Sequence, residues 1–137
     1  MKVIARLKEE HPGKIRFSLV ENTSRQDALE IYRSSDILID QMMIGWYGGV
    51  AVEAMKMGVP VACYIEDSDL DFVPMAMRQQ LPIYRVTMRT LYHDLQRLLK
   101  SRDLIPELAK KSRDYVNQWH DPLVISNHIL DKVNLLD

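Results

Sequence analysis

GWYGGVAVEAMKMGVP, residues 45–60, is the stretch of this chain with the strongest structural signal. The segment 36–41 before it and the apolar segment 61–65 after it both have strand composition. Paired glycines predict a tight turn, residues 50–57 have the spacing of a short helix, and Gly58 with Pro60 predicts where that helix ends. A strand, a helix and a strand in this order are typical of a crossover between parallel strands, so the stretch predicts an α/β fold.

The same alternation of helix and strand continues on both sides of this stretch. Working outward, the patterns predict a helix from the start of the chain to residue 11, a strand over Ile15–Glu21, a helix capped by Ser24, a short strand over Ile83–Val86, and helices from Met88 onward with breaks near Pro106 and before Pro122. We therefore expect a Rossmann-like parallel sheet of about four strands with a helical C-terminal third. Residues 1–137 form one domain, with an α/β part over 1–87 and helices over 88–137.

Composition excludes several classes of function. The chain has 137 residues, 18 basic and 19 acidic, and its formal net charge of −1 argues against a nucleic-acid-binding protein. No apolar run reaches the ~20 residues of a membrane span, and no apolar signal-peptide core follows Met1, so a cytoplasmic location is expected. The one cysteine, Cys63, cannot form an internal disulfide and is expected in a buried strand.

The glycine-rich turn points to a phosphate ligand. Backbone N–H groups around Gly48, Gly49 and Val50 would open a helix, and a helix N-terminus favours an anion. Glu53 lies one turn further along, where its carboxylate could accept two ribose hydroxyls while a diphosphate rests on the helix start. The alternative is a tight turn whose glycines serve packing alone, and the residues by themselves leave both interpretations open.

The order of motifs is informative beyond their composition. Ser34-Ser35-Asp36-Ile37, the glycine loop, Glu53-Ala54-Met55 and Gly58-Val59-Pro60-Val61 together resemble the nucleotide-sugar-binding segment of GT-B glycosyltransferases, and more narrowly glycosyltransferase family 4, also called group 1. That family has two glutamates separated by seven residues. Glu53 matches the second, Gly48 the glycine of the motif and Tyr47 its usual aromatic residue, whereas Gly45 stands where the first glutamate would be.

The resemblance implies transfer of a sugar from a nucleotide-diphosphate-sugar to an unknown acceptor, with no metal and no further cofactor. It implies that Glu53, Gly48, Gly49 and Val50 hold the nucleotide. The implied donor-sugar loop is Gly45, Trp46 and Tyr47, although Gly45 puts recognition of the sugar in doubt. Val20, Glu21 and Asn22 would contact the base through their backbone. No catalytic residue is assigned.

The resemblance also implies an incomplete domain. The family's N-terminal acceptor domain and the basic pair that holds the diphosphate have no counterpart, so we expect the chain alone to be inactive. A strand over Ile15–Glu21 would lack an inner neighbour, which predicts self-association or pairing with a partner chain. The competing class of function is a non-catalytic nucleotide-binding or partner-binding module.

Other motifs in the chain have simpler explanations than a functional site. The acidic run 66–71 contains two Asp-x-Asp patterns that could hold a divalent metal, but a solvated loop is favoured. Asp40 ends a strand, as a receiver-domain phosphoacceptor does, although Glu21-Asn22 and Arg85 fit that class poorly. The basic tract 97–113 is expected to be a solvated helix face, with weak contact to the inner face of an anionic membrane as the alternative. The histidines are expected to be structural or solvated, and the methionines to fill the core.

Overall fold

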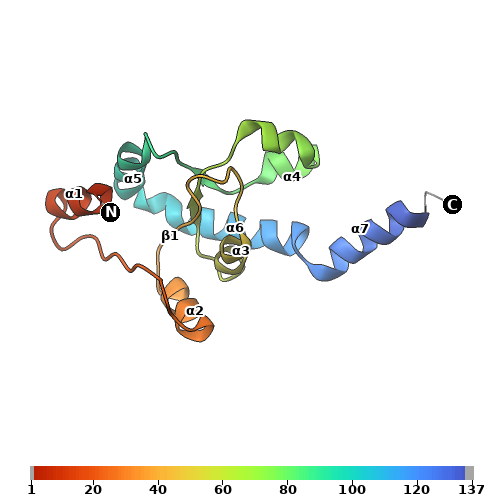
Figure 1. Ribbon diagram of the computed structural model, residues 1–137, viewed down its shortest axis with the longest axis horizontal. Helices are drawn as coiled ribbons and strands as arrows, with labels where there is room; N and C mark the ends of the chain where they lie inside the picture. The colour runs from red at the N-terminus through yellow and green to blue at the C-terminus, as the bar shows by residue number, and fades with distance from the viewer. Residues whose placement is uncertain (1, 135–137) are drawn as a thin grey trace.

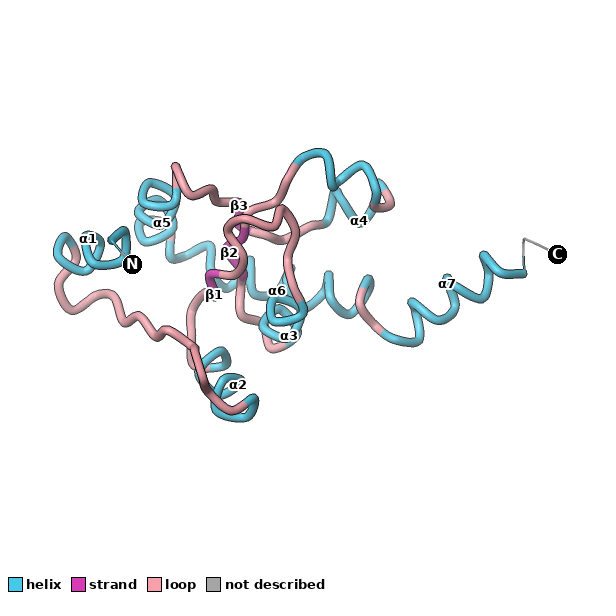
Figure 2. Tube along the Cα trace, viewed as in Figure 1, coloured by secondary structure: helices cyan, strands magenta, loops and turns pink. Residues whose placement is uncertain are grey.

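Three short parallel strands form the sheet of this α/β protein, whose computed structural model describes residues 2–134 (Figures 1 and 2). The strands are β1 (Leu38–Ile39), β2 (Val61–Cys63) and β3 (Tyr84–Arg85), in the order β1-β2-β3. Leu38 pairs with Val61, and Ala62 pairs with Tyr84. All three residues of β2 have no exposed surface, as expected for a central parallel strand covered on both faces.

The crossover predicted around residues 45–60 is confirmed. Helix α3 (Gly49–Lys56) connects β1 to β2 and ends where Gly58 adopts a φ of +79°. The Val59 amide then donates to the Ala54 carbonyl over 2.9 Å, which satisfies a carbonyl at the helix end. A Cβ on Gly58 would lie 2.5 Å from the Arg113 guanidinium, so glycine suits both the backbone and the neighbouring side chain.

The strand predicted over Ile15–Glu21 is wrong, and the sheet has three strands rather than about four. The segment is extended, and its alternation holds only over residues 15–18, with Ile15 and Phe17 half-buried and Arg16 and Ser18 exposed, because Leu19 is 55% exposed. No backbone–backbone hydrogen bond among the described residues involves residues 15–21. An alternating pattern indicates that one side of a segment is buried, but a β-strand also needs a neighbouring strand to pair with. This segment runs from α1 to α2 apart from the sheet, so it has no such neighbour (Figure 2).

The two N-terminal helices form as predicted. Helix α1 spans Lys2–Glu10, and α2 spans Arg25–Arg33 with the Ser24 hydroxyl accepting from the Asp27 amide over 3.1 Å. Helix α1 lies against α5 (Leu91–Lys100), and polar side chains join the two helices. The Arg6 guanidinium lies 4.0 Å from the centre of the Tyr92 ring, and Glu10 accepts from the Tyr92 hydroxyl over 2.5 Å.

The C-terminal part is helical, with breaks at the predicted places. Its elements are α5, η2 (Arg102–Leu104), α6 (Ile105–Trp119) and α7 (Pro122–Asn134), whereas η1 (Asp67–Phe72) and α4 (Met75–Gln80) lie between β2 and β3. Pro106 lies in the first turn of α6, and Pro122 begins α7. Helix α6 packs on α3, while α7 projects away from the rest of the chain (Figure 1). No helix within residues 2–134 has both the length and the apolar character to cross a bilayer.

The core lies between α3, β2 and α6. Ala51, Ala54 and Met55 of α3 pack with Tyr115 and Val116 of α6. Cys63 is fully buried in β2, as predicted. The prediction that methionines fill the core holds for Met55, but it is wrong for Met43 and Met75, which are 84% and 74% exposed. These two lie outside the strands, at places where no other element covers them.

Candidate functional site

The glycine loop follows β1 at the carboxyl end of the sheet, where open α/β folds bind ligands. Gly45 has a φ of +88°, and its carbonyl accepts from the Glu66 amide over 2.8 Å. A Cβ at this position would lie 2.9 Å from the Glu66 Cβ and 3.1 Å from the Asp69 Oδ2. The glutamate expected here from the family resemblance would therefore be strained in its backbone and crowded by two carboxylates.

Asp40 fixes the start of α3. Its Oδ2 accepts from the Gly48 amide over 3.1 Å, and a Cβ on Gly48 would clash with the Gln41 amide. The next two positions are open. Nothing lies within 4 Å of a Cβ built on Gly49, and Val50 is 40% exposed. Because the first N–H groups of a helix lack intrahelical acceptors, the amides of Gly49 and Val50 remain available to an anion, whereas that of Gly48 is occupied.

Glu53 contacts Arg25, the first residue of α2. Its Oε1 lies 2.5 Å from Nη2 of Arg25, and the two side chains are 37% and 79% exposed. The Glu53 carboxylate holds the pKa of Arg25 above its ordinary value through this hydrogen bond. Arg25 begins α2 three residues after Asn22, which adopts a φ of +52°. The structure thus brings the start of α2 to Glu53, while no hydrogen bond or ion pair of Glu53 with Val20, Glu21 or Asn22 is present among the described residues.

The two aromatic residues of the loop point into the protein. Trp46 stacks on Tyr47 with ring centroids 4.8 Å apart, and Tyr47 is only 6% exposed. The Tyr47 hydroxyl lies 2.9 Å from the Tyr115 hydroxyl and 2.9 Å from Nε2 of His120. Burial raises the pKa of both tyrosines and lowers that of His120. This three-residue network holds the loop to α6, so Tyr47 is placed as an anchor of the loop.

The other candidate motifs have structural surroundings of their own. In the acidic run, Asp67 pairs with Arg85 over 2.8 Å and Asp71 pairs with Arg78 over 3.1 Å. Within residues 2–134, no group of three or more His, Cys, Asp or Glu side chains is placed to hold a metal ion. Burial, and next the charge of Asp40, raise the pKa of Cys63 to about 11, which suits a structural thiol rather than a nucleophile.

Three residues of this region were missed by the sequence patterns. Arg25 reaches Glu53 across 28 residues, and Tyr115 and His120 reach Tyr47 across 68 and 73 residues. No local motif marks such contacts. A coupled substitution pattern among relatives would be the signal to seek. Comparisons with protein-family models, with curated proteins and with solved structures found no match to this chain.

Proposed function

We propose that this chain binds the nucleotide of a nucleotide-diphosphate-sugar, as the donor-binding part of a glycosyltransferase similar to group 1 of the GT-B class. The proposal rests on the motif order of residues 34–61 together with one structural observation, the contact between Glu53 and Arg25. The contact joins Glu53 to the first residue of α2, and Glu53 itself lies about one helical turn from the open amides of Gly49 and Val50, which supports a role for its carboxylate in binding ribose.

The Glu53 carboxylate has hydrogen-bonding capacity left for ribose. A carboxylate has four lone-pair positions, and Arg25 is the only described side chain that hydrogen-bonds it. Two vicinal hydroxyls can therefore donate to Glu53 without displacing Arg25. The Arg25 guanidinium, 79% exposed, also brings a positive charge to a site where a diphosphate would bring negative charge.

Asp40 limits where the diphosphate can lie. Its carboxylate already accepts the Gly48 amide and would repel a phosphate placed on that donor. The proposal therefore assigns the diphosphate to Gly49 and Val50. It follows that Asp40→Asn, which keeps an acceptor for Gly48 but removes the charge, should tighten binding of a nucleoside diphosphate by about two- to fivefold.

The test is a titration with uridine, guanosine and adenosine diphosphates, followed by amide NMR. The expected result is saturable binding of at least one diphosphate, with the largest shifts at Gly49, Val50 and Glu53 and with the parent nucleoside binding more weakly. The control for Asp40→Asn is Asp114→Asn, which removes one exposed carboxylate from within α6, away from any helix start. Binding that maps elsewhere, or no binding by any diphosphate at millimolar concentration, contradicts the proposal.

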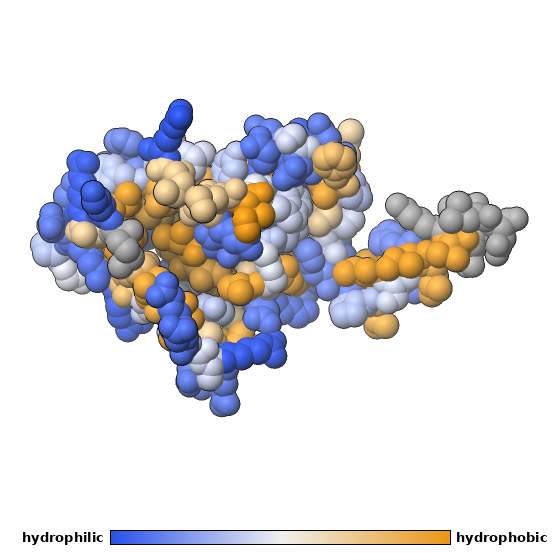
Figure 3. Space-filling view, in the orientation of Figure 1, coloured by the Kyte–Doolittle hydropathy of each residue, from blue (hydrophilic) through white to orange (hydrophobic). Residues whose placement is uncertain are grey.

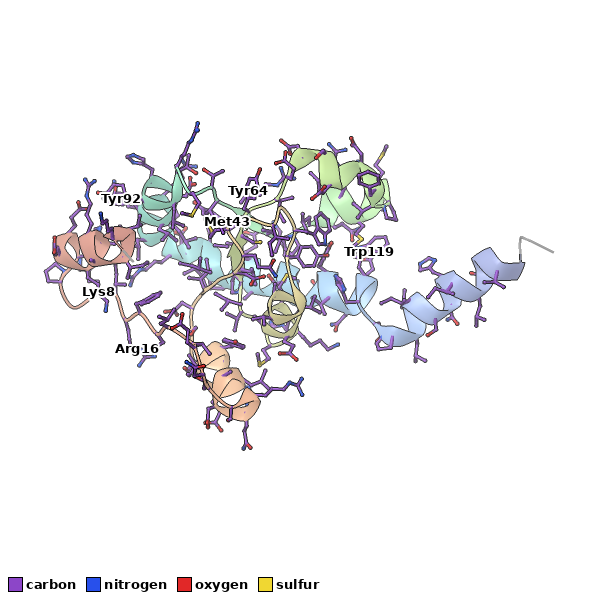
Figure 4. The ribbon with its side chains drawn as sticks, in the orientation of Figure 1. Lys8, Arg16, Met43, Tyr64, Tyr92 and Trp119 are labelled. Atoms are coloured by element: carbon purple, nitrogen blue, oxygen red, sulfur yellow. The ribbon has the colours of Figure 1, made fainter. Side chains whose placement is uncertain are left out.

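A second candidate function is favoured by exposed apolar side chains near the same loop. Met43 and Ile44 precede Gly45 and are 84% and 71% exposed, and Phe72 is 86% exposed at the end of η1. Figure 4 shows Met43 and Tyr64 close to the middle of the molecule. Their two segments are joined by the hydrogen bond between the Glu66 amide and the Gly45 carbonyl. Such groups fit a partner-binding module without a nucleotide, and the titration above separates the two functions.

A further inference from the structure

A basic pocket lies on a different part of the molecule, between the turn after α1 and the end of α5. It encloses about 430 Å³ and is lined by His11, Lys14, Leu99, Lys100 and Arg102. Lys14 and Arg102 come from segments 88 residues apart, and Arg102 Nη2 donates to the Lys14 carbonyl over 3.0 Å. In Figure 4, Lys8 and Arg16 mark the two sides of the turn that carries His11 and Lys14.

The positive charges in this pocket have no ion-pair partner among the described residues. None of Lys14, Lys100 and Arg102 lies within 4 Å of a carboxylate oxygen of residues 2–134. Helices α1 and α5 both end nearby, and their C-terminal dipoles are equivalent to roughly −0.5 charge each. Two such ends offset about one of the three positive charges. The positive charge therefore exceeds what stabilising the two helix ends requires.

A polar atom of the pocket also lacks a partner. Nε2 of His11 is buried, and no group of the described residues lies within hydrogen-bond distance of it. Buried polar atoms in folded proteins nearly always have partners, so this nitrogen is an exception. Because Nε2 has almost no exposed surface, other atoms of His11 line the pocket, and the ring serves as a reporter at the pocket wall. The volume of the pocket lies within the range of small-molecule sites, which suits a phosphorylated group.

We propose that this pocket binds a phosphate monoester or diester, with Lys14, Lys100 and Arg102 neutralising the phosphate beside the His11 ring. The phosphate belongs either to a phosphorylated small molecule or to the headgroup of an anionic lipid. Arg102 has donors left after its bond to Lys14, because a guanidinium carries five N–H groups. This site is independent of the nucleotide site proposed above, which lies at the glycine loop.

Inorganic phosphate is the probe for the site itself, and the imidazole NMR signals of the histidines are the readout. We expect the His11 signals to shift saturably, while those of His93 and His128, which are exposed and outside the pocket, stay in place. Lys14→Gln with Lys100→Gln should weaken phosphate binding about tenfold or more. Lys2→Gln with Lys110→Gln removes the same charge from exposed positions outside the pocket and should change binding less than about twofold.

Vesicles of phosphatidylcholine with and without phosphatidylglycerol distinguish the two sources. If the protein binds the anionic vesicles and only the pocket double variant loses this binding, the ligand is a lipid headgroup. Phosphate binding without vesicle binding identifies a soluble phosphorylated molecule. An unmoved His11 signal, or equal losses in the two double variants, overturns the proposal. If the pocket double variant does not fold, the wild-type His11 titration and the single variant Lys100→Gln still test phosphate binding. Lys100→Gln is expected to fold, because Lys100 makes no described side-chain hydrogen bond.

Discussion

The substitution Glu53→Gln has different expected effects on nucleotide affinity if Glu53 binds ribose and if Glu53 is only structural. Glu53→Gln removes the charge but keeps an oxygen for Arg25, so we expect nucleoside-diphosphate affinity to fall about ten- to a hundredfold. The free energy of unfolding without ligand should change by less than ~1 kcal/mol, because an exposed ion pair contributes little. Isothermal titration and denaturant unfolding measure the two quantities.

The control for Glu53 is Glu30→Gln, which changes an exposed carboxylate on α2 that has no ion pair among the described residues. A 2′-deoxy nucleotide provides a second test. It should bind the wild type more weakly than the ribonucleotide does, whereas the two nucleotides should bind Glu53→Gln with similar affinities. Unaltered affinity in Glu53→Gln, where wild-type binding is measurable, would assign Glu53 to structure alone.

Gly45 shows how far a motif can be followed residue by residue. The sequence indicated that glycine replaces the first glutamate of the family, and it left open whether the loop still binds a sugar. The structure supplies a reason for the glycine, a φ of +88° and the approach of Glu66 and Asp69. That reason depends on the path of a loop 20 residues further along the chain, which no local pattern of Gly45–Tyr47 contains.

Between elements, the network of Tyr47, Tyr115 and His120 connects the glycine loop to the end of α6. Tyr47→Phe leaves the Tyr115 hydroxyl and the His120 Nε2 without their common partner, so we expect a loss of about 1–3 kcal/mol in the free energy of unfolding. Tyr32→Phe is the matched control, because the buried Tyr32 makes no described side-chain hydrogen bond. Urea unfolding of both variants tests the prediction, and equal small losses would contradict it.

The same network predicts how stability depends on pH. Burial lowers the pKa of His120 in the folded state, so the unfolded state binds its proton first as pH falls. Stability is therefore full above pH ~6.5 and decreases below it, with a slope under about 1.4 kcal/mol per pH unit. His120→Gln should remove this part of the dependence. Unfolding should be measured between about pH 7.5 and 5.5. Hydrogen bonds from Tyr92 and Lys111 lower the pKa values of Glu10 and Glu107, so these two carboxylates change stability only at lower pH. Identical slopes in wild type and variant would contradict the prediction.

The elements that sequence predicts well are those whose causes are local. The crossover over residues 36–65 follows from strand composition, a helical spacing and the glycine at its end, and all of these lie within 30 residues. The strand predicted over Ile15–Glu21 failed because pairing requires an edge from elsewhere in the fold. The contact of Arg25 with Glu53 is also non-local, which explains why the sequence located Glu53 but not its partner.

Across the whole molecule, apolar side chains remain uncovered where the chain departs from the core. Helix α7 exposes apolar surface along its length (Figure 3). Ile125, Ile129 and Val133 follow one another at four-residue spacing on one side of it, and they are 41%, 57% and 54% exposed. A helix of this length is marginal in water without packing. Its structure in solution therefore depends on covering this stripe.

We predict that the chain covers the stripe by self-association, because a second copy presents the same apolar stripe. Sedimentation velocity over the micromolar range should show a concentration-dependent shift from monomer to dimer. Ile129→Lys places a charge in the stripe and should weaken association about tenfold or more. Asn127→Lys adds the same charge to an exposed position about 200° around the helix from Ile129 and should leave association unchanged. A wild-type chain that stays monomeric at every concentration, or equal effects of the two substitutions, would show that α7 is not the associating surface.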